Sequence, residues 1–464
     1  MSQSSGYGAL HPRQKQICKS LVENLIKCGL PVSLVDCDGF RKFMSDVDPR
    51  FQVPCRQTVS ASYLPQLLAE KHSLIADILS SASDVALTID IWSDRRQHAF
   101  LGITAHIFDI AKGVPQSMLL KFQSFREIHS GENIARAVEN CICEAGLIGK
   151  VHFIVCDNAS NMRKAFSFIF APGPRGNLES WLGAETNQSD QLAVEDSDAV
   201  IDDATLYEDV PDLDCDALNA GERIPCFAHS LQLVIRDGLQ KVAVSRTAVA
   251  KCAKLANMTH QSVKFRASFE DAFGKGRCVP ASNDTRWNSV YRQLKSIVDL
   301  DMNKLSEVLR KEEQGSLIMT QKELQQVREL VSTLAPFAEA TDIAQGTTYI
   351  TMSYIVPVLL SLLQHLSTQH TSVKYNIPFV RELLSSLFTR FRGIFEQLQI
   401  PYPAGVSGST AKHTDKPTAK NLHFDSNVFV MATCIDPQHG YRWLELHPGS
   451  VAEKEVLKNR IFSK

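Results

Sequence analysis

The sequence predicts an α/β protein in which a sheet lies between two helical regions. Short runs rich in β-branched and aromatic residues, the composition of strands, occur between residues 85 and 156. Apolar residues recur at helical spacing on both sides of this stretch, in residues 14–80 and 320–400. The length of 464 residues exceeds that of one usual compact core, so we expect two or three domains.

The period of the sequence changes at residue 85, where the strand-like runs begin. Three follow in order: Val85–Trp92, Ala99–Asp109 and Gln116–Phe125. Gly131–Ala145 then has apolar residues on one helical face, Val151–Cys156 is a fourth strand, and Ser160–Phe168 begins another helix. Three strands, a helix, a strand and a helix match the ribonuclease-H-like order. That order places the first and fourth strands side by side.

Two aspartates close two of these strands and form the first candidate site. Asp90 lies near the end of the first strand, and Asp157 follows the fourth strand directly. Because burying a carboxylate is costly without a compensating cation, two of them on neighbouring strands are candidates to share divalent metal ions. Capping is the alternative, since Asp157 precedes residues that favour helix starts, namely Asn158, Ser160 and Asn161. Mg²⁺ or Mn²⁺ is expected only if this acidic site is functional.

Charge is divided unevenly along the chain, although the net charge of −2 does not itself indicate a nucleic-acid binder. Residues 176–222 contain no Lys or Arg, and twelve acids fall between Glu185 and Asp216. This composition predicts a disordered, solvated insertion; an acidic segment that masks a basic surface is the alternative. Residues 241–295 contain eleven Lys and Arg against three acids, a net charge of +8. Such a stretch is typical of a DNA-contacting surface, with a solvated helical face as the alternative.

Candidate nucleic-acid-binding residues lie in this basic stretch. Arg286 and Trp287 are adjacent, and arginine contacts phosphates while an indole ring stacks on bases. For Trp287, a core aromatic is the alternative. The other candidates are Lys264, Arg266, Arg292 and Lys295.

Cys226 and His229 form a Cys-x-x-His pair just before an amphipathic helix, for which Ser230 is the expected N-cap. Structural zinc sites need about four ligands, and the sequence contains no Cys-x-x-Cys pair that could supply two more. We therefore expect a buried Cys226 and a locally hydrogen-bonded His229 rather than a zinc site.

These patterns divide the chain into seven segments. We expect a helical N-terminal region (1–80), the first part of the core (81–170), an acidic disordered insertion (171–222), a continuation of the core (223–245), a helical insertion domain (246–400), a flexible linker (401–422) and a truncated C-terminal segment (423–464). The linker is expected because residues 401–420 are rich in Pro, Gly, Ser, Thr and Lys.

Seven short motifs occur in an order that resembles that of a known transposase family. They are Asp-Pro-Arg-Phe at 48–51, Leu-Thr-Ile-Asp-Ile-Trp-Ser at 87–93, Phe-Leu-Gly-Ile-Thr-Ala-His at 100–106, Cys-Asp-Asn-Ala-Ser-Asn-Met at 156–162, Cys-Phe-Ala-His-Ser-Leu-Gln-Leu-Val at 226–234, Asp-Thr-Arg-Trp-Asn-Ser at 284–289 and Ile-Asp-Pro-Gln-His at 435–439. Over residues 14–440, the chain resembles transposases of the hAT (hobo–Activator–Tam) superfamily. It is also similar to their domesticated relatives, the zinc-finger BED domain-containing proteins.

The resemblance implies a ribonuclease-H-like core interrupted by a long helical insertion. Asp90 and Asp157 match the first two members of a DDE metal-binding triad. The family tryptophan that Trp287 matches stacks against an unpaired base near the cleavage point. Cys226 and His229 match a pair that lies close to the catalytic core.

The chain departs from the family pattern where the third acid is expected. The family's glutamate lies in a Ser-x-x-Glu-Arg-x-Phe-Ser-like helix, and no such motif occurs in this sequence. Glu445, Glu453 and Glu455 lie in the right part of the chain by order only. We expect a chain without the BED finger and without most of the C-terminal dimerisation region, which leaves homo-oligomer formation open. Since two carboxylates hold a second ion poorly, transposase activity is not expected.

From this resemblance we expect a domesticated or degenerate transposase-like protein in the nucleus, which binds DNA and acts as a transcriptional regulator. Two alternatives stay open: an active metal-dependent transposase or nuclease, and a protein-interaction scaffold without a role on DNA. No membrane partner is expected, because no apolar run reaches the roughly 18–20 residues that span a bilayer.

Overall fold

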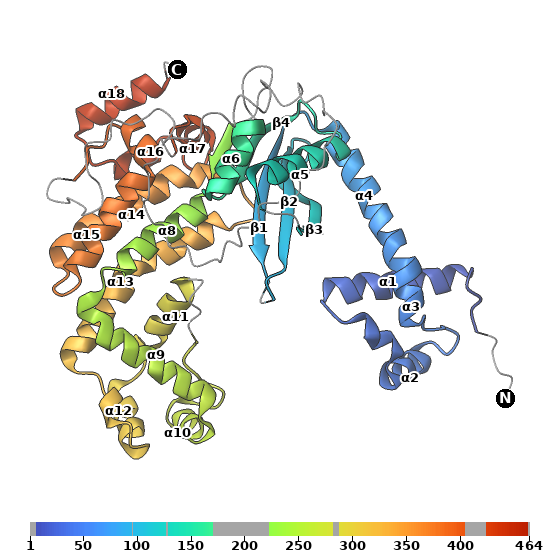
Figure 1. Ribbon diagram of the computed structural model, residues 1–464, viewed down its shortest axis with the longest axis horizontal. Helices are drawn as coiled ribbons and strands as arrows, with labels where there is room; N and C mark the ends of the chain where they lie inside the picture. The colour runs from blue at the N-terminus through green and yellow to red at the C-terminus, as the bar shows by residue number, and fades with distance from the viewer. Residues whose placement is uncertain are drawn as a thin grey trace, which may run out of the picture. The chain divides into compact units, whose positions relative to one another are not determined.

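The structure is a computed structural model that describes residues 6–94, 96–126, 129–169, 222–281, 287–403 and 424–462 (Figure 1). It divides into two compact units. Unit 1 consists of Met1–Val85 and Glu139–Lys150, and unit 2 consists of Ala86–Val138 and Val151–Lys464. Unit 1 is mainly helical, whereas unit 2 combines strands with a larger set of helices. The predicted α/β class is confirmed.

Unit 1 is built from short helices around small apolar clusters. Its elements are α1 (Pro12–Lys27), η1 (Val32–Asp36), α2 (Asp38–Val47), α3 (Arg56–Thr58), η2 (Val59–Tyr63) and α4 (Leu64–Ser81). α1 begins at Pro12, where a missing N–H costs nothing because the first turn has no partner for it. One cluster buries side chains from four positions: Val22, Leu25, Val35 and Val59.

A five-stranded mixed sheet carries the candidate acids. Its strands are β1 (Val85–Ser93), β2 (Ala99–Asp109), β3 (Val114–Ser124), β4 (Val151–Cys156) and β5 (Glu222–Pro225). They lie in the order β3-β2-β1-β4-β5, with β1, β2 and β3 antiparallel and β4 parallel to β5. The helices α5 (Gly131–Glu144) and α6 (Ser160–Ile169) flank β4 in sequence. The predicted neighbourhood of the first and fourth strands is therefore confirmed.

Alternation along β1 and β2 decides which side chains are buried. Leu87 and Ile89 on β1 and Leu101 and Ile103 on β2 are at most 3% exposed. Side chains at alternate positions point to opposite faces of a sheet, so Asp90 projects from the face opposite to these apolar residues. Asp90 is exposed on that face.

The remaining helices of unit 2 follow β5 in sequence. They are α8 (Phe227–Leu239), η4 (Ala243–Ser245), α9 (Arg246–Gln261), α10 (Val263–Phe273), α11 (Trp287–Val298), α12 (Met302–Lys311), η5 (Gly315–Leu317), α13 (Gln321–Ala344), η6 (Thr351–Tyr354), α14 (Ile355–Ser372), α15 (Ile377–Arg390), α16 (Arg392–Gln397), α17 (Val428–Ile435), η7 (Arg442–Leu446) and α18 (Val451–Phe462). The prediction that Ser230 caps α8 is wrong. The helix begins one turn earlier with Cys226 as N-cap, and the Ser230 hydroxyl donates to the Cys226 carbonyl oxygen at 2.9 Å.

One apolar core joins these helices to part of the sheet. Ile224 of β5 lies in that core, and Phe153 and Val155 of β4 pack against it. The predicted division at residues 246 and 400 stays a prediction. Residues 171–221 of the predicted acidic insertion and residues 404–422 of the predicted linker lie outside the described residues.

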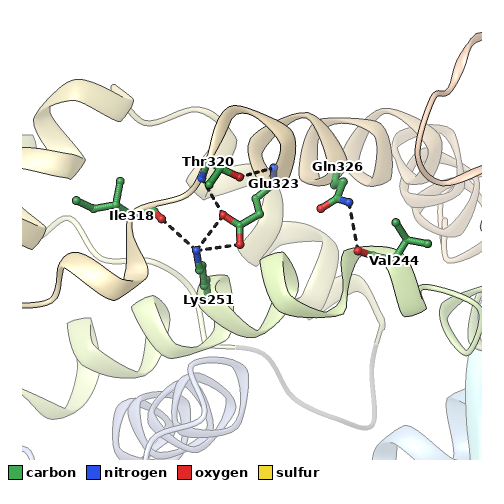
Figure 2. A network of polar contacts seen from close by, with 6 residues as sticks. All are labelled: Val244, Lys251, Ile318, Thr320, Glu323 and Gln326. Carbon is green, nitrogen blue, oxygen red and sulfur yellow. Dashed lines mark hydrogen bonds and ion pairs between the residues drawn. The ribbon is translucent and has the colours of Figure 1, made fainter.

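A polar network connects α9 to the start of α13 (Figure 2). The Lys251 ammonium lies 2.8 Å from the Glu323 carboxylate and donates to the Ile318 carbonyl oxygen at 3.1 Å. Glu323 also forms a capping box with Thr320, whose backbone N–H donates to the carboxylate at 2.8 Å. Burial acts to raise the pKa of Glu323, but the hydrogen bonds from Lys251 and Thr320 outweigh it and lower the pKa.

Replacing Lys251 with methionine is expected to lower the free energy of unfolding by about 1–3 kcal/mol at pH 7, because a partly buried carboxylate loses its cation. The pKa of Glu323 is lower in the folded chain. The network therefore stabilises the folded chain at pH values above the pKa that Glu323 has in the unfolded chain. That contribution disappears as pH falls through the folded pKa. Urea unfolding at pH 7 and at acid pH should therefore show a wild-type advantage at pH 7 that shrinks in acid. Lys254→Met, at an exposed position of α9, is the control, and an equal effect from it would contradict the role of the network.

Candidate functional site

Asp90 lies on β1 opposite Gly102 of β2. It shares its face of the sheet with Thr88 and Trp92, because residues two apart on a strand point the same way. Gly102 presents no side chain beside the carboxylate. The local sequence thus places an exposed acid beside a glycine against which the Trp92 indole lies.

Asp157 follows β4 and is half-buried. Its Oδ1 accepts a hydrogen bond from the Ala159 N–H at 3.0 Å, two residues further on. This bond forms an Asx turn just ahead of α6, so Asp157 shapes the loop before the helix. The local hydrogen bond and a metal-binding role are compatible, since a carboxylate has lone pairs to spare.

The charges of both aspartates act on the Cys226 thiol. Burial raises the pKa of the Cys226 thiol, the backbone N–H groups of His229 and Ala228 lower it, and the charges of Asp90 and Asp157 raise it. Both carboxylates therefore lie within electrostatic reach of one sulfur atom at the start of α8. His229 lies in the first turn of the same helix and is half-buried.

Arg223 on β5 holds the loop that carries Asp157. Its guanidinium donates to the Asp157 carbonyl oxygen at 2.6 Å, to Asn158 Oδ1 at 2.5 Å and to Cys156 Sγ at 3.2 Å. Burial raises the pKa of Cys156 to about 11 despite the nearby guanidinium. Sequence reasoning missed Arg223. The available signal was its place as the first basic residue after a stretch without Lys or Arg.

The described residues do not gather a complete metal site. Within them, no group of three or more His, Cys, Asp or Glu side chains is arranged to hold an ion. Glu453 caps its own helix by accepting from the Ser450 N–H at 2.7 Å, and Glu455 lies 3.9 Å from Lys458. Mg²⁺ and Mn²⁺ prefer oxygen ligands, and a thiol with a raised pKa is a poor substitute. The two-ion arrangement of strand transfer needs ligands on both metal ions, more than two carboxylates alone supply.

The candidate DNA contacts on α10 are already paired with acids. Lys264 lies 3.2 Å from Glu312, and Arg266 lies 2.9 Å from Glu270. These pairs offset much of the positive charge that the sequence assigned to α10. The two positions remain predictions, with less charge available to a phosphate.

Apart from Lys251, which pairs with Glu323, the Lys and Arg residues of α9 and α11 face solvent. Arg292 and Lys295 are exposed on α11, and α9 exposes Arg246 and Lys254. Neither helix contains an acid, and the two helices contact each other. The basic surface is therefore concentrated on α9 and α11.

Trp287, the first residue of α11, is 8% exposed. Its ring lies 6.3 Å from that of Tyr291, between ring centroids. In this arrangement the indole packs within the core and does not present a face to solvent. Arg286, the neighbouring candidate, lies outside the described residues.

The segment that carries the pair of aspartates is similar to a ribonuclease-like domain found in transposase-related proteins. The family model described as the ZBED1 RNase-like domain matches residues 88–170, which carry Asp90 and Asp157. The chain is a hAT-transposase-like protein, similar to BED zinc-finger proteins and to Activator transposases. The resemblance predicted from the sequence motifs is confirmed.

Three relatives define the extent of this similarity. “Zinc finger BED domain-containing protein RICESLEEPER 3” of Oryza sativa is 20% identical over 300 residues, 64% of this chain and 35% of the relative. “Putative AC transposase” of Zea mays is 20% identical over 347 residues, 72% of this chain and 37% of the relative. “Putative transcriptional regulator tpeD” of Talaromyces stipitatus is 21% identical over 385 residues, 77% of this chain and 41% of the relative. The chain thus spans less than half the length of each.

Proposed function

We propose that this transposase-derived chain is a nuclear DNA-binding protein with a ribonuclease-H-like core, and that it binds duplex DNA through α9 and α11 without catalysing strand transfer. The observation that carries this proposal is a pair of contacting helices that contain no acid and on which Arg246, Lys254, Arg292 and Lys295 are exposed. Lysine and arginine side chains on one surface bind phosphates and release condensed counterions, which supplies most of the affinity for DNA of any sequence.

The absence of strand transfer follows from the acids available. Asp90 and Asp157 are two carboxylates, and a two-ion mechanism needs the attacking and the leaving oxygen to be balanced by separate metal ions. Within the described residues no third acid joins these two, so a second ion would have too few ligands there. The protein would then keep the shape of the ancestral core as a scaffold for binding.

We also propose that this DNA binding serves to regulate transcription. One relative carries the name of a transcriptional regulator, and another that of a BED zinc-finger protein. A protein that holds DNA without cutting it can recruit or exclude other factors at its site, and such a role requires nuclear localisation. Within the described residues, no helix combines the length and apolar character required to cross a bilayer.

Binding of the full chain to a fluorescent duplex of about 30 base pairs tests the proposal. Fluorescence anisotropy at increasing salt should give a logarithmic affinity that falls linearly with the logarithm of salt concentration, with a slope of about −0.9 for each phosphate contacted. No binding even at low salt would overturn the proposal and favour a protein-interaction scaffold.

A metal-dependent nuclease is the second candidate. It is favoured by the effect of both Asp90 and Asp157 on the same thiol, which is what a shared acidic pocket would produce. Nicking of a DNA hairpin that requires Mn²⁺ and disappears in Asp90→Ala would support this candidate. Retention of nicking in Asp90→Ala would assign it to a contaminant.

A further inference from the structure

Three aromatic side chains form an open patch on the sheet, which we call the aromatic platform: Trp92 of β1, Phe100 of β2 and Phe122 of β3. The ring centroids lie 5.6–6.1 Å apart, and the rings of Phe100 and Phe122 are within 5° of parallel. Trp92 is 40% exposed and Phe122 is 58% exposed. Such large apolar surface in contact with water indicates a binding face.

Gly102 makes room for the largest ring of the platform. Trp92 pairs with Phe100 across the β1–β2 ladder, and Gly102 pairs with Asp90 and with Phe122. A Cβ atom at position 102 would lie only 3.0 Å from the indole ring of Trp92. The glycine therefore lets the indole lie across the strand while part of the tryptophan remains exposed.

Positive side chains border the platform at one end of the sheet. The turn between β1 and β2 carries Arg96, and Arg126 comes two residues after the end of β3; both are exposed. Asp94 in this turn accepts hydrogen bonds from the backbone N–H groups of Arg96 and His98 at 2.8 and 2.9 Å. The acid is thus engaged in shaping the turn, and the arginines are available to an anion.

We propose that the aromatic platform binds an unpaired DNA base, stacked on Trp92 and Phe122, with the flanking phosphates near Arg96 and Arg126. Proteins bind single-stranded nucleic acids by combining aromatic rings with cationic side chains, because every base has a π-face that can stack and every phosphate carries a negative charge. Asp90 lies two residues before Trp92 on the same face, about 7 Å along the strand. The neighbouring nucleotide would therefore reach the acidic pair.

A nucleic acid fits this surface better than a polypeptide. A purely apolar partner would cover the rings without any need for the arginines at the edge. The inference rests on the proposed DNA-binding function, but it assigns a second surface. Duplex binding belongs to α9 and α11, whereas the unpaired base belongs to the sheet.

The test uses the full chain and two probes of the same sequence, a 12-nucleotide single strand containing 2-aminopurine and the corresponding duplex. Trp92→Ala and Phe122→Ala should each weaken single-strand binding by about fivefold to 100-fold, the usual effect of losing a stacking partner. They should also reduce quenching of the 2-aminopurine fluorescence. Trp92→Phe, which keeps a ring, should retain most of the binding and guards against a loss caused by misfolding.

Phe108→Ala is the matched control, because Phe108 is an aromatic residue of β2, 50% exposed, that lies outside the platform. Duplex affinity should be unchanged in all variants. Unchanged single-strand affinity in Trp92→Ala and Phe122→Ala, with duplex binding intact, would overturn the inference and leave the proposed function standing. Loss of a dimer in those variants, without loss of single-strand binding, would make the platform a protein interface and also overturn it. If the wild type binds neither probe, both proposals fail.

Discussion

Replacing Glu329 with leucine is expected to lower the free energy of unfolding by about 3 kcal/mol or more, because three backbone donors and one side-chain donor, two of them on the buried Asn376, would lose their partner. The Glu329 carboxylate on α13 accepts from the backbone N–H groups of Lys374, Tyr375 and Asn376 at 3.0–3.1 Å. It also accepts from the Asn376 side-chain amide at 3.1 Å. Glu329 is 6% exposed and Asn376 is 2% exposed, so water cannot easily replace these bonds.

The geometry explains why one side chain has such a large effect. The turn between α14 and α15 points successive N–H groups inward, and a carboxylate is the only kind of side chain that can accept from all of them at once. Leucine has a similar volume but no acceptor. The loss therefore comes from unsatisfied donors and not from a cavity.

Urea unfolding followed by circular dichroism measures this effect, and hydrogen exchange at residues 374–376 locates it. Glu339→Leu is the control, since Glu339 is an exposed residue of the same helix. Surface substitutions usually change stability by no more than about 0.5 kcal/mol. A similarly small change for Glu329→Leu, with exchange protection at residues 374–376 intact, would contradict the prediction.

Neutralising Arg292 and Lys295 together is expected to reduce affinity for duplex DNA roughly 10- to 100-fold at about 0.1 M salt. The double variant Arg292→Gln and Lys295→Gln removes two exposed cations from α11. If each contacts one phosphate, the salt dependence should also become shallower by about 2 in slope. Both quantities come from one set of anisotropy titrations of wild type and variant.

The matched control removes two cations from α10. Lys264→Gln and Arg266→Gln change the net charge by the same amount, but these residues are already paired with Glu312 and Glu270. Their loss should weaken binding much less. Equal effects from the two double variants would mean that only overall charge matters, and that α11 is not the contact surface.

Four of the five strands could be predicted because their signals are local, whereas the short strand β5 was not predicted. The runs around Asp90 and Asp157 have the composition of strands, and their order along the chain predicts that β1 lies beside β4. The start of α8 could not be placed in the same way. Serine is a favoured residue at the N-cap of a helix, but the chain enters α8 directly after β5. There the Cys226 N–H donates a backbone hydrogen bond to the Cys156 carbonyl oxygen at 2.7 Å, which fixes the direction in which α8 begins.

Other features depend on contacts between distant residues. Arg223 reaches Asp157 only because β5 lies parallel to β4, and no spacing in the sequence reports that pairing. The neutralisation of Lys264 by Glu312 depends on the packing of α10 against α12. Composition counts charges along the chain, whereas binding depends on which charges the fold leaves facing solvent.

The hydrogen bonds from Arg223 to Asp157 and Asn158 have a consequence for changes in chain length between β4 and β5. The chain leaves the sheet after Asp157 and returns to it at β5, and the guanidinium fastens the point of departure to the point of return. A change in chain length between these anchor points would therefore begin and end at positions that Arg223 holds together, and should leave the acidic pair undisturbed.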